Sequence, residues 1–395
     1  MKSRREKNLK YLNKNKSYCV MPFSEIYVDN AGRYKLCCHA ERIDKLDKYN
    51  SSTHNPFDFF LSKEMDEVRN KMLSGEKISA CEICYEQEKH GESFRTGKYN
   101  GKYDIVTAPV EIGLKLRVNG SFCNLSCYMC HPYNSSTKRN EMKEVFGTHL
   151  VEGFYNGTSE FKSVKHDRWN SIVDDIIKHI HLIKFIHLTG GEPLQLPKHW
   201  QMLDKIPNEY AKNISLSYDT NLTELRYKNY SVYNVIDKFK KVHFGISCDH
   251  YQEKLSWIRY PIDVKQFEKN LKEMLDSGFN ANISCTISLL NVFDLIDINN
   301  YYKNKFGANV HFNSIVTTPN FLSIRHLPID VKQKLLKQLD IPVYDIRGVS
   351  KFQLVKTQLK LEGDTSNLQK AYDYMNKLSK NRNFDWKKLW PDFLK

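Results

Sequence analysis

The amino-acid sequence predicts an α/β fold, a partial TIM-like (β/α)6 barrel of parallel strands. Strand-like and helix-like segments alternate in the middle of the chain, and such alternation favours parallel strands with helices packed outside them. Along the strands, apolar residues also alternate with polar ones. The six strand candidates are residues 111–119, 184–190, 214–220, 241–249, 282–288 and 309–315.

Apolar periodicity predicts the helices. Apolar residues recur at three- and four-residue steps over 169–180, 264–275 and 368–378, which is the spacing of one helix face. Asp263 is placed to cap the start of the second of these helices, and Gly278 to end it. We expect the third to belong to a C-terminal helical extension.

The alternation along the strands predicts a ligand-binding interior. In a sheet covered by helices on both faces, strands read as continuous apolar runs. Here one side of each strand is polar, so we expect that side to line an interior. An ordinary sheet with one solvated face is the alternative. The polar side carries Lys115, Arg117, His187, Thr189, His243, Ser247, Asp249, Ser284, Thr286 and His311.

The chain has 395 residues and a formal net charge of +14. We expect three parts, namely a cysteine-rich module at 1–105, the barrel at 106–330 and the helical extension at 331–395. No apolar run approaches the ~18 residues that a transmembrane helix needs. The basic start is not followed by an apolar segment, so we expect no secretory signal, no membrane partner and a cytoplasmic location.

The ten cysteines are grouped along the chain. In a reducing compartment, clustered cysteines indicate metal ligands or catalytic thiols rather than disulfides. Two stand alone, on the apolar side of their strands, where packing is expected and hydrogen-atom donation to a substrate radical is the alternative. The groups are Cys19, Cys37, Cys38, Cys81 and Cys84, then Cys123, Cys127 and Cys130, and finally the isolated Cys248 and Cys285.

Three cysteines form a C-x3-C-x2-C loop directly after the first predicted strand. Thiolates select zinc or iron–sulfur clusters. Structural zinc normally takes four protein ligands, and His131 has little freedom to join its neighbour Cys130 on one ion. A [4Fe-4S] cluster held by three cysteines leaves one iron open to a cofactor or substrate. The spacing alone leaves zinc as the alternative.

A second motif, Thr-Gly-Gly-Glu-Pro at 189–193, ends the next predicted strand. Its glycine pair lets the backbone approach a ligand closely. The carboxyl ends of parallel strands are also where α/β folds place their sites. The motif is neither a dinucleotide-binding G-x-G-x-x-G nor a P-loop.

With both motifs in this order, residues 111 to 315 resemble the radical S-adenosylmethionine (SAM) enzymes. One position departs from the family pattern, because the residue before the last cysteine is usually aromatic and is Met129 here. The resemblance implies that Cys123, Cys127 and Cys130 hold a [4Fe-4S] cluster that binds SAM. One-electron reduction, with flavodoxin or ferredoxin as the electron donor, would release a 5′-deoxyadenosyl radical that abstracts a substrate hydrogen.

The same resemblance implies the residues that contact SAM. Gly190, Gly191 and Glu192 match the segment that holds its amino group, and Thr220 and Asn221 match the family's strand end. Ser247 and Asp249 match polar positions near the ribose of SAM, and the alternative is that they only cap a strand end. Arg259 resembles a residue that meets the SAM carboxylate, and the alternative is a surface cation.

The first cysteine group offers a second four-thiolate site. A turn at 29–32 suggests a hairpin that delivers Cys37 and Cys38, which point to opposite sides of an extended chain, so only one of them would ligate. This stretch resembles the SPASM or twitch auxiliary-cluster region of radical SAM proteins, placed before the barrel. The resemblance implies a second [4Fe-4S] cluster, with structural zinc as the alternative. The matching features are Cys19, Pro22, Cys37 or Cys38, Arg69, Cys81 and Cys84.

Radical SAM relatives with auxiliary clusters often modify peptides or proteins, so we expect a peptide or protein substrate first. A sugar, a nucleoside or another small metabolite is the alternative substrate. A different class is a basic, metal-stapled nucleic-acid-binding protein, because phosphate contacts need Lys and Arg. However, the cations are spread along the chain, and no nucleic-acid-binding signature is present. Nucleic acid is therefore the disfavoured partner.

Overall fold

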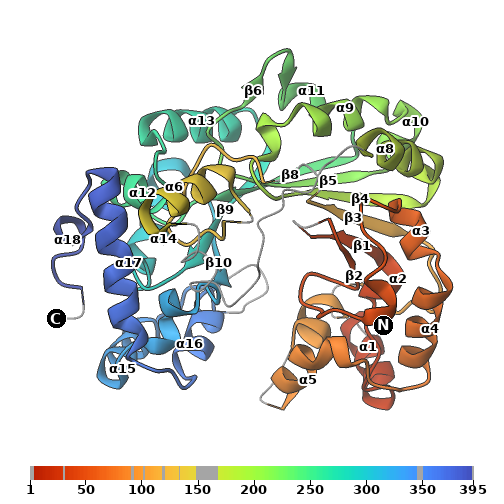
Figure 1. The fold of residues 1–395 in the computed structure, drawn as a ribbon, viewed down its shortest axis with the longest axis horizontal. Coiled ribbons are helices and arrows are strands. Elements are labelled where there is room, and N and C mark those ends of the chain that lie inside the picture. The colour runs from red at the N-terminus through yellow and green to blue at the C-terminus, as the bar shows by residue number, and fades with distance from the viewer. Residues whose placement is uncertain are drawn as a thin grey trace.

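One mixed sheet organises the protein (Figure 1), in a computed structural model that describes residues 4–29, 32–89, 93–100, 103–117, 121–132, 134–147, 168–344 and 350–393. The described strands run in the order β10-β9-β8-β5-β4-β3-β1-β2. All neighbours pair in parallel except β1 and β2. The strands are β1 (Glu25–Val28), β2 (Tyr34–Lys35), β3 (Ile112–Leu116), β4 (Ile183–Leu188), β5 (Ser215–Thr220), β8 (Lys241–Ser247), β9 (Asn280–Ile287) and β10 (Val310–Ile315).

All six predicted barrel strands are present, so the α/β prediction with a parallel sheet is confirmed. Expected residues 118 and 119 lie outside the described part of the chain. Burial alternates strictly along β3 and β5: their leucines, isoleucine and tyrosine are buried, Lys115, Ser217 and Asp219 are half-buried, and Thr220 is a buried polar residue at the end of β5. Residues between β5 and β8 add a small antiparallel pair, β6 (Arg226–Tyr227) and β7 (Tyr230–Ser231).

Helices in the connections cover the convex side of the sheet in Figure 1. The predicted caps hold, because Asp263 accepts from the Gln266 amide at 3.1 Å and Gly278 follows the helix end with φ +76°. Helices in and around the barrel are α6 (Ser136–Phe146), α8 (Trp169–Lys178), α9 (Pro197–Lys205), α10 (Asn208–Ala211), α11 (Tyr233–Ile236), α12 (Gln252–Ile258), α13 (Val264–Asp276) and α14 (Leu295–Phe306).

The N-terminal region shares the barrel's sheet. The predicted hairpin is present as β1 and β2, and residues 30 and 31 of its turn lie outside the described residues. β1 pairs in parallel with β3, so the hairpin extends the barrel's sheet by two strands. The Phe57 amide also donates to Asp175 of α8 at 2.9 Å. Helices of this region are α1 (Arg4–Lys14), α2 (Met21–Ser24), α3 (Pro56–Phe60), α4 (Lys63–Leu73) and α5 (Glu82–Glu88).

The C-terminal part is helical, as predicted, and lies at the opposite end of the sheet from the N-terminal region (Figure 1). Its aromatic end docks on the body: Trp386 is buried, and the Trp257 indole donates to the Phe384 carbonyl at 3.0 Å. The helices are α15 (Ile329–Gln338), α16 (Gln353–Leu359), α17 (Asn367–Arg382) and α18 (Trp386–Leu389). Among the described residues, none of the helices is both long and apolar enough to cross a membrane.

Candidate functional site

The three-cysteine loop leaves the carboxyl end of β3. Cys123 and Cys127 are buried and Cys130 is half-buried. Burial raises the pKa of each thiol, that of Cys130 to about 12, and the thiols also act on one another electrostatically. Three thiols grouped in a dry site are costly as anions, and a bound cation offsets that cost. The residues therefore fit a thiolate-bound metal centre.

Hydrogen bonds fix the backbone of the loop, but its cysteine side chains are not already arranged as metal ligands. In the part of the chain that the structure describes, no three His, Cys, Asp or Glu side chains stand as a ready-made metal-binding group. The backbone around Cys127 is nevertheless fixed on both sides. The Ser126 and Tyr128 amides donate to the carbonyls of Tyr260 and Ile258, at 2.6 and 2.9 Å.

The opposite side of the same backbone is held by α17. Arg382 donates to the Ser126 carbonyl and the Tyr374 hydroxyl donates to the Tyr128 carbonyl, each at 2.6 Å. Both residues flanking Cys127 therefore have their amides and carbonyls occupied by distant parts of the chain. Peptide groups that are fully hydrogen-bonded in a buried site resist displacement.

A buried charge cluster lies behind the loop. Arg382 donates to both carboxylate oxygens of Glu141, at 2.6 and 2.9 Å, and to the Trp257 carbonyl at 2.7 Å. Lys138 donates to Glu141 at 3.0 Å, and the Ser126 hydroxyl also contacts that carboxylate. Burial lowers the pKa of Lys138 to about 8. For Glu141, burial raises the pKa, but the two cations outweigh it and bring it to about 2.

Sequence reasoning missed this cluster, although a signal was present. Arg382 comes four residues after Leu378 and so continues the apolar stripe of α17. A cation at a stripe position is buried and must find a partner inside the protein.

The Thr-Gly-Gly-Glu-Pro turn packs directly against the start of the cysteine loop. Gly190 and Gly191 have φ of +88° and +56°. A Cβ on Gly191 would lie 2.0 Å from the Phe122 carbonyl oxygen, which also accepts from the Glu192 amide at 2.8 Å. Only glycine permits this approach.

Glu192 turns its carboxylate inward. It accepts from the Leu194 amide at 3.1 Å, the Thr220 hydroxyl at 2.7 Å and the Asn221 amide at 2.7 Å. Burial raises its pKa to about 7, against these hydrogen bonds. The Asn221 side chain in turn donates to Cys123 Sγ at 3.8 Å. Glu192 thus joins the turn to the end of β5 and, through Asn221, to the cysteine loop.

Arg259 and Asp249 form a buried ion pair beside Cys127, so Arg259 is not a surface cation. Arg259 Nε lies 2.8 Å from Asp249 Oδ2, and Nη1 donates to Cys127 Sγ at 3.8 Å. Burial lowers the pKa of Arg259, but the charges of Asp249 and Cys127 raise it above its usual value. Among the described residues, neither Nε nor Oδ2 has a polar partner beyond this ion pair.

Two predicted cofactor positions differ in their surroundings. Asp249 is fully buried, and its second oxygen accepts from the Thr286 amide at 2.7 Å, so it also ties β8's end to β9. Ser247 is half-buried on the concave side of β8. The expected polar alternation therefore breaks at Asp249.

The N-terminal cysteines are also grouped. Cys19 acts electrostatically on Cys37 and Cys81, and Cys81 on Cys84. All four are buried, and burial raises the pKa of Cys37 and Cys81 to about 12. Cys38 instead lies 3.2 Å from the Tyr99 hydroxyl.

Arg69 fixes the chain near Cys19. Its buried guanidinium donates to the carbonyls of Pro22 at 2.9 Å and Phe60 at 2.6 Å. The two non-cysteine residues of the SPASM-like resemblance, Pro22 and Arg69, thus contact each other. This contact gives that pattern a structural role.

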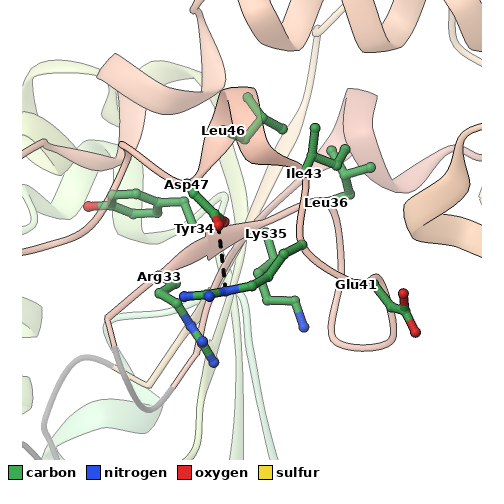
Figure 2. A pocket seen from close by; sticks show the side chains of 9 residues that line it. Arg33, Tyr34, Lys35, Leu36, Glu41, Ile43, Leu46 and Asp47 are labelled. Atoms are coloured by element: carbon green, nitrogen blue, oxygen red, sulfur yellow. Dashed lines mark ion pairs between the residues drawn. The ribbon is translucent and has the colours of Figure 1, made fainter.

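A separate small pocket lies beside β2 and the 3-10 turn Asp44–Leu46 (Figure 2). An ion pair of 3.7 Å joins Arg42 and Asp47 there. No cysteine lines it, and we assign it no part in the site. Its lining residues are Arg33, Tyr34, Lys35, Leu36, Glu41, Arg42, Ile43, Leu46 and Asp47.

The two isolated cysteines are buried on the apolar side of the sheet, as expected for packing residues. Cys248 Sγ lies 2.9 Å from the Tyr302 hydroxyl, and the Asn291 amide donates to Cys285 Sγ at 3.5 Å.

Replacing Gly191 with alanine is expected to destabilise the protein beyond the usual backbone cost. The new Cβ would meet the Phe122 carbonyl at 2.0 Å. Gly307→Ala is the matched control, because Gly307 lies in the left-handed region with φ +65° and ψ +11° and no atom lies within 4 Å of the new Cβ, so it should cost only about 1–2 kcal/mol. Urea unfolding of the metal-free proteins measures both, and equal losses would contradict the steric account.

Arg382→Met is expected to lower the free energy of unfolding by about 3–5 kcal/mol, because it breaks a buried ion pair. Hydrogen exchange of amides 123–130 should quicken in the metal-free protein. Lys380→Met, on the exposed side of the same helix, should change stability by less than about 0.5 kcal/mol. Unchanged exchange in the arginine variant would show that α17 does not hold the loop.

Glu192 should make stability fall as pH rises from about 4.5 to about 7. Its pKa is raised in the folded protein to about 7, so between these values the folded state binds more proton than the unfolded state, and the slope is negative. Glu192→Gln should remove this part of the pH dependence. Denaturant titrations of the metal-free proteins at several pH values test it, and identical slopes would refute the assignment.

Comparison with known proteins bears on this site. Residues 120–301 match the radical SAM superfamily model. Similar solved structures include native anSMEcpe with bound AdoMet, with 18% identity over 57% of this chain and 59% of that chain and a TM-score of 0.41. Streptococcus suis SuiB bound to S-adenosylmethionine has 16% identity over 72% and 58%, with a TM-score of 0.36. TYW1 with a lysine-pyruvate adduct bound has 15% identity over 55% and 70%, with a TM-score of 0.33.

The chain thus spans about three-fifths of the length of the first two structures. No curated protein matches it. The family match covers the three-cysteine loop, the glycine turn, and the Asp249–Arg259 pair. Residues 120–301 of this chain are therefore similar to the radical SAM superfamily domain, and this stretch holds the site described above.

Proposed function

We propose that the protein cleaves SAM reductively and uses the 5′-deoxyadenosyl radical to abstract a hydrogen from a peptide or protein. A [4Fe-4S] cluster on Cys123, Cys127 and Cys130 would supply the electron for this cleavage. The observation that carries the proposal is the convergence of three thiols, the glycine turn and the Arg259–Asp249 pair at one edge of the sheet.

The chain's own residues would bind and orient SAM. Arg259 has five N–H donors and commits them only in part to Asp249 and Cys127, so it can meet the SAM carboxylate. The Glu192 carboxylate already accepts three hydrogen bonds. We therefore assign the SAM amino group to the backbone of residues 190–192, with Asn221 supporting the turn. Ser247 and Asp249 remain the proposed ribose-side residues.

We also propose an auxiliary [4Fe-4S] cluster on Cys19, Cys37, Cys81 and Cys84, within a module of residues 1–105. The mutual electrostatic effects of these buried thiols support the set, and the Tyr99 contact of Cys38 favours Cys37 as the ligand. Structural zinc on the same thiols is the alternative. Residues 106–330 would form the barrel and 331–395 the helical extension.

The peptide class rests on the resemblance of residues 1–105 to auxiliary-cluster regions. A sugar, nucleoside or other small metabolite is the second candidate, and nucleic-acid binding without radical chemistry the third. We further propose a flavodoxin or ferredoxin as the electron donor and a cytoplasmic location.

Anaerobic reconstitution with iron and sulfide, reduction and addition of SAM test the function. We expect 5′-deoxyadenosine from the wild type and about eight iron atoms per chain, as two cubanes require. Cys127→Ala should abolish cleavage because the SAM-binding cluster is lost.

Cys81→Ala is the matched variant. It should retain some SAM cleavage while losing product, and iron should fall to about four atoms per chain. Equal loss of cleavage in both variants would contradict separate roles. Persistent absence of 5′-deoxyadenosine from a wild type that carries its cluster and binds SAM would sink the proposal.

A further inference from the structure

The concave face of the sheet carries a row of basic side chains. Strand register aligns one residue from each of six neighbouring strands, and aligned residues project from the same face. Apart from the buried Tyr27, they are half-buried. In order from the sheet's edge they are Lys35, Tyr27, Lys115, His187, Ser217 and His243.

Arg117 adds a second cation to β3's side of this face, two residues beyond Lys115. Asp219 lies two residues beyond Ser217 on β5. Its carboxylate is 3.0 Å from His187 Nε2 and is therefore already paired. Glu25 lies two residues below Tyr27 on β1. Lys115 has no ion pair with a carboxylate among the described residues, and its nearest aromatic contact is the Tyr27 ring at 5.9 Å. Among the described residues, Lys115 is thus a cation of this face without a carboxylate ion pair of its own.

These cations lie between the two cysteine groups. Lys115 acts electrostatically on Cys38, next to the N-terminal group, and also on Asp219. Arg117 acts on Cys130 of the cysteine loop and also on Tyr27. Because such effects fall with distance, Lys115 lies within electrostatic range of Cys38 and Arg117 within range of Cys130.

Lys115 is aligned with His187 on the neighbouring strand and with Lys35 across Tyr27, and charges of like sign on facing positions cost stability when both are ionised. A row that exists only as a solvated surface gains nothing to offset this repulsion. A bound oxyanion would offset it, and Arg and Lys are the side chains that bind carboxylate and phosphate best.

We propose that Lys115 and Arg117 bind an oxyanion of the substrate, a carboxylate or a phosphate, on the concave face between the two cysteine groups. This deepens the proposed function and rests on it, because the bound molecule is the substrate only if the protein cleaves SAM. The oxyanion site itself does not depend on SAM cleavage. In a peptide substrate the group is an Asp or Glu side chain or the terminal carboxylate. In a metabolite it is a phosphate.

The test uses the full chain and two probes, inorganic phosphate and a short Glu-containing peptide with its Gln counterpart. Calorimetric titration compares the wild type with Lys115→Met and Lys115→Gln. The matched control is Lys184→Met, an exposed lysine of β4 on the opposite face of the sheet. Removal of the Lys115 charge should lower the affinity for the probe about tenfold or more. The control variant should bind the probe as the wild type does.

The outcomes separate the sources of the oxyanion. Lys115-dependent binding of phosphate alone identifies a phosphorylated substrate, and Lys115-dependent preference for the Glu over the Gln peptide identifies a carboxylate. Either supports the site. Binding of both probes within twofold of wild type in both Lys115 variants, or no binding by the wild type, overturns it.

Thermal unfolding of the metal-free variants adds a readout that a structural lysine would not give. Relief of repulsion should leave Lys115→Met at least as stable as the wild type, and a loss of stability in both Lys115 variants would contradict the ligand role. The 5′-deoxyadenosine assay is independent. If it fails while Lys115-dependent binding persists, the function falls and the oxyanion site stands.

Discussion

The buried contact between Arg382 and Glu141 is the constraint on which the site depends. One guanidinium contacts the carboxylate of α6, the Trp257 carbonyl at the end of α12 and the Ser126 carbonyl of the cysteine loop. These three segments surround Cys127. Because the charges are buried, loss of one partner leaves another uncompensated. The geometry of the loop therefore depends on a side chain outside the family-matched residues 120–301.

The pairing of β1 with β3 is a second constraint, and it joins the two cysteine groups. The hairpin that leads to Cys37 and the strand that leads to Cys123 are neighbours in one sheet. Parallel pairing fixes their register, so the separation of the two groups is set by a rigid element rather than by a linker. Lys115 lies in β3, the strand that spans this separation, and Arg117 directly follows it.

Much of the fold was predictable because its signals are local. The six barrel strands alternate in polarity, α13 carries its own cap in Asp263, and the two motifs sit at strand ends. The pairing of β1 was not predictable, because a strand of four residues leaves no clear periodicity. The inward orientation of the Glu192 carboxylate and the burial of Asp249 were also not predictable from the sequence. Both are set by partners on other strands, Thr220 and Thr286.

The position of Arg382 in the chain has a consequence for biosynthesis. Its contact with the Ser126 carbonyl spans 256 residues of sequence, so the ribosome must synthesise the chain through α17 before the loop can reach its final form. Contacts of such long range form late in folding. Metal insertion at Cys127 would then follow the synthesis of α17, on a loop that this helix has already shaped.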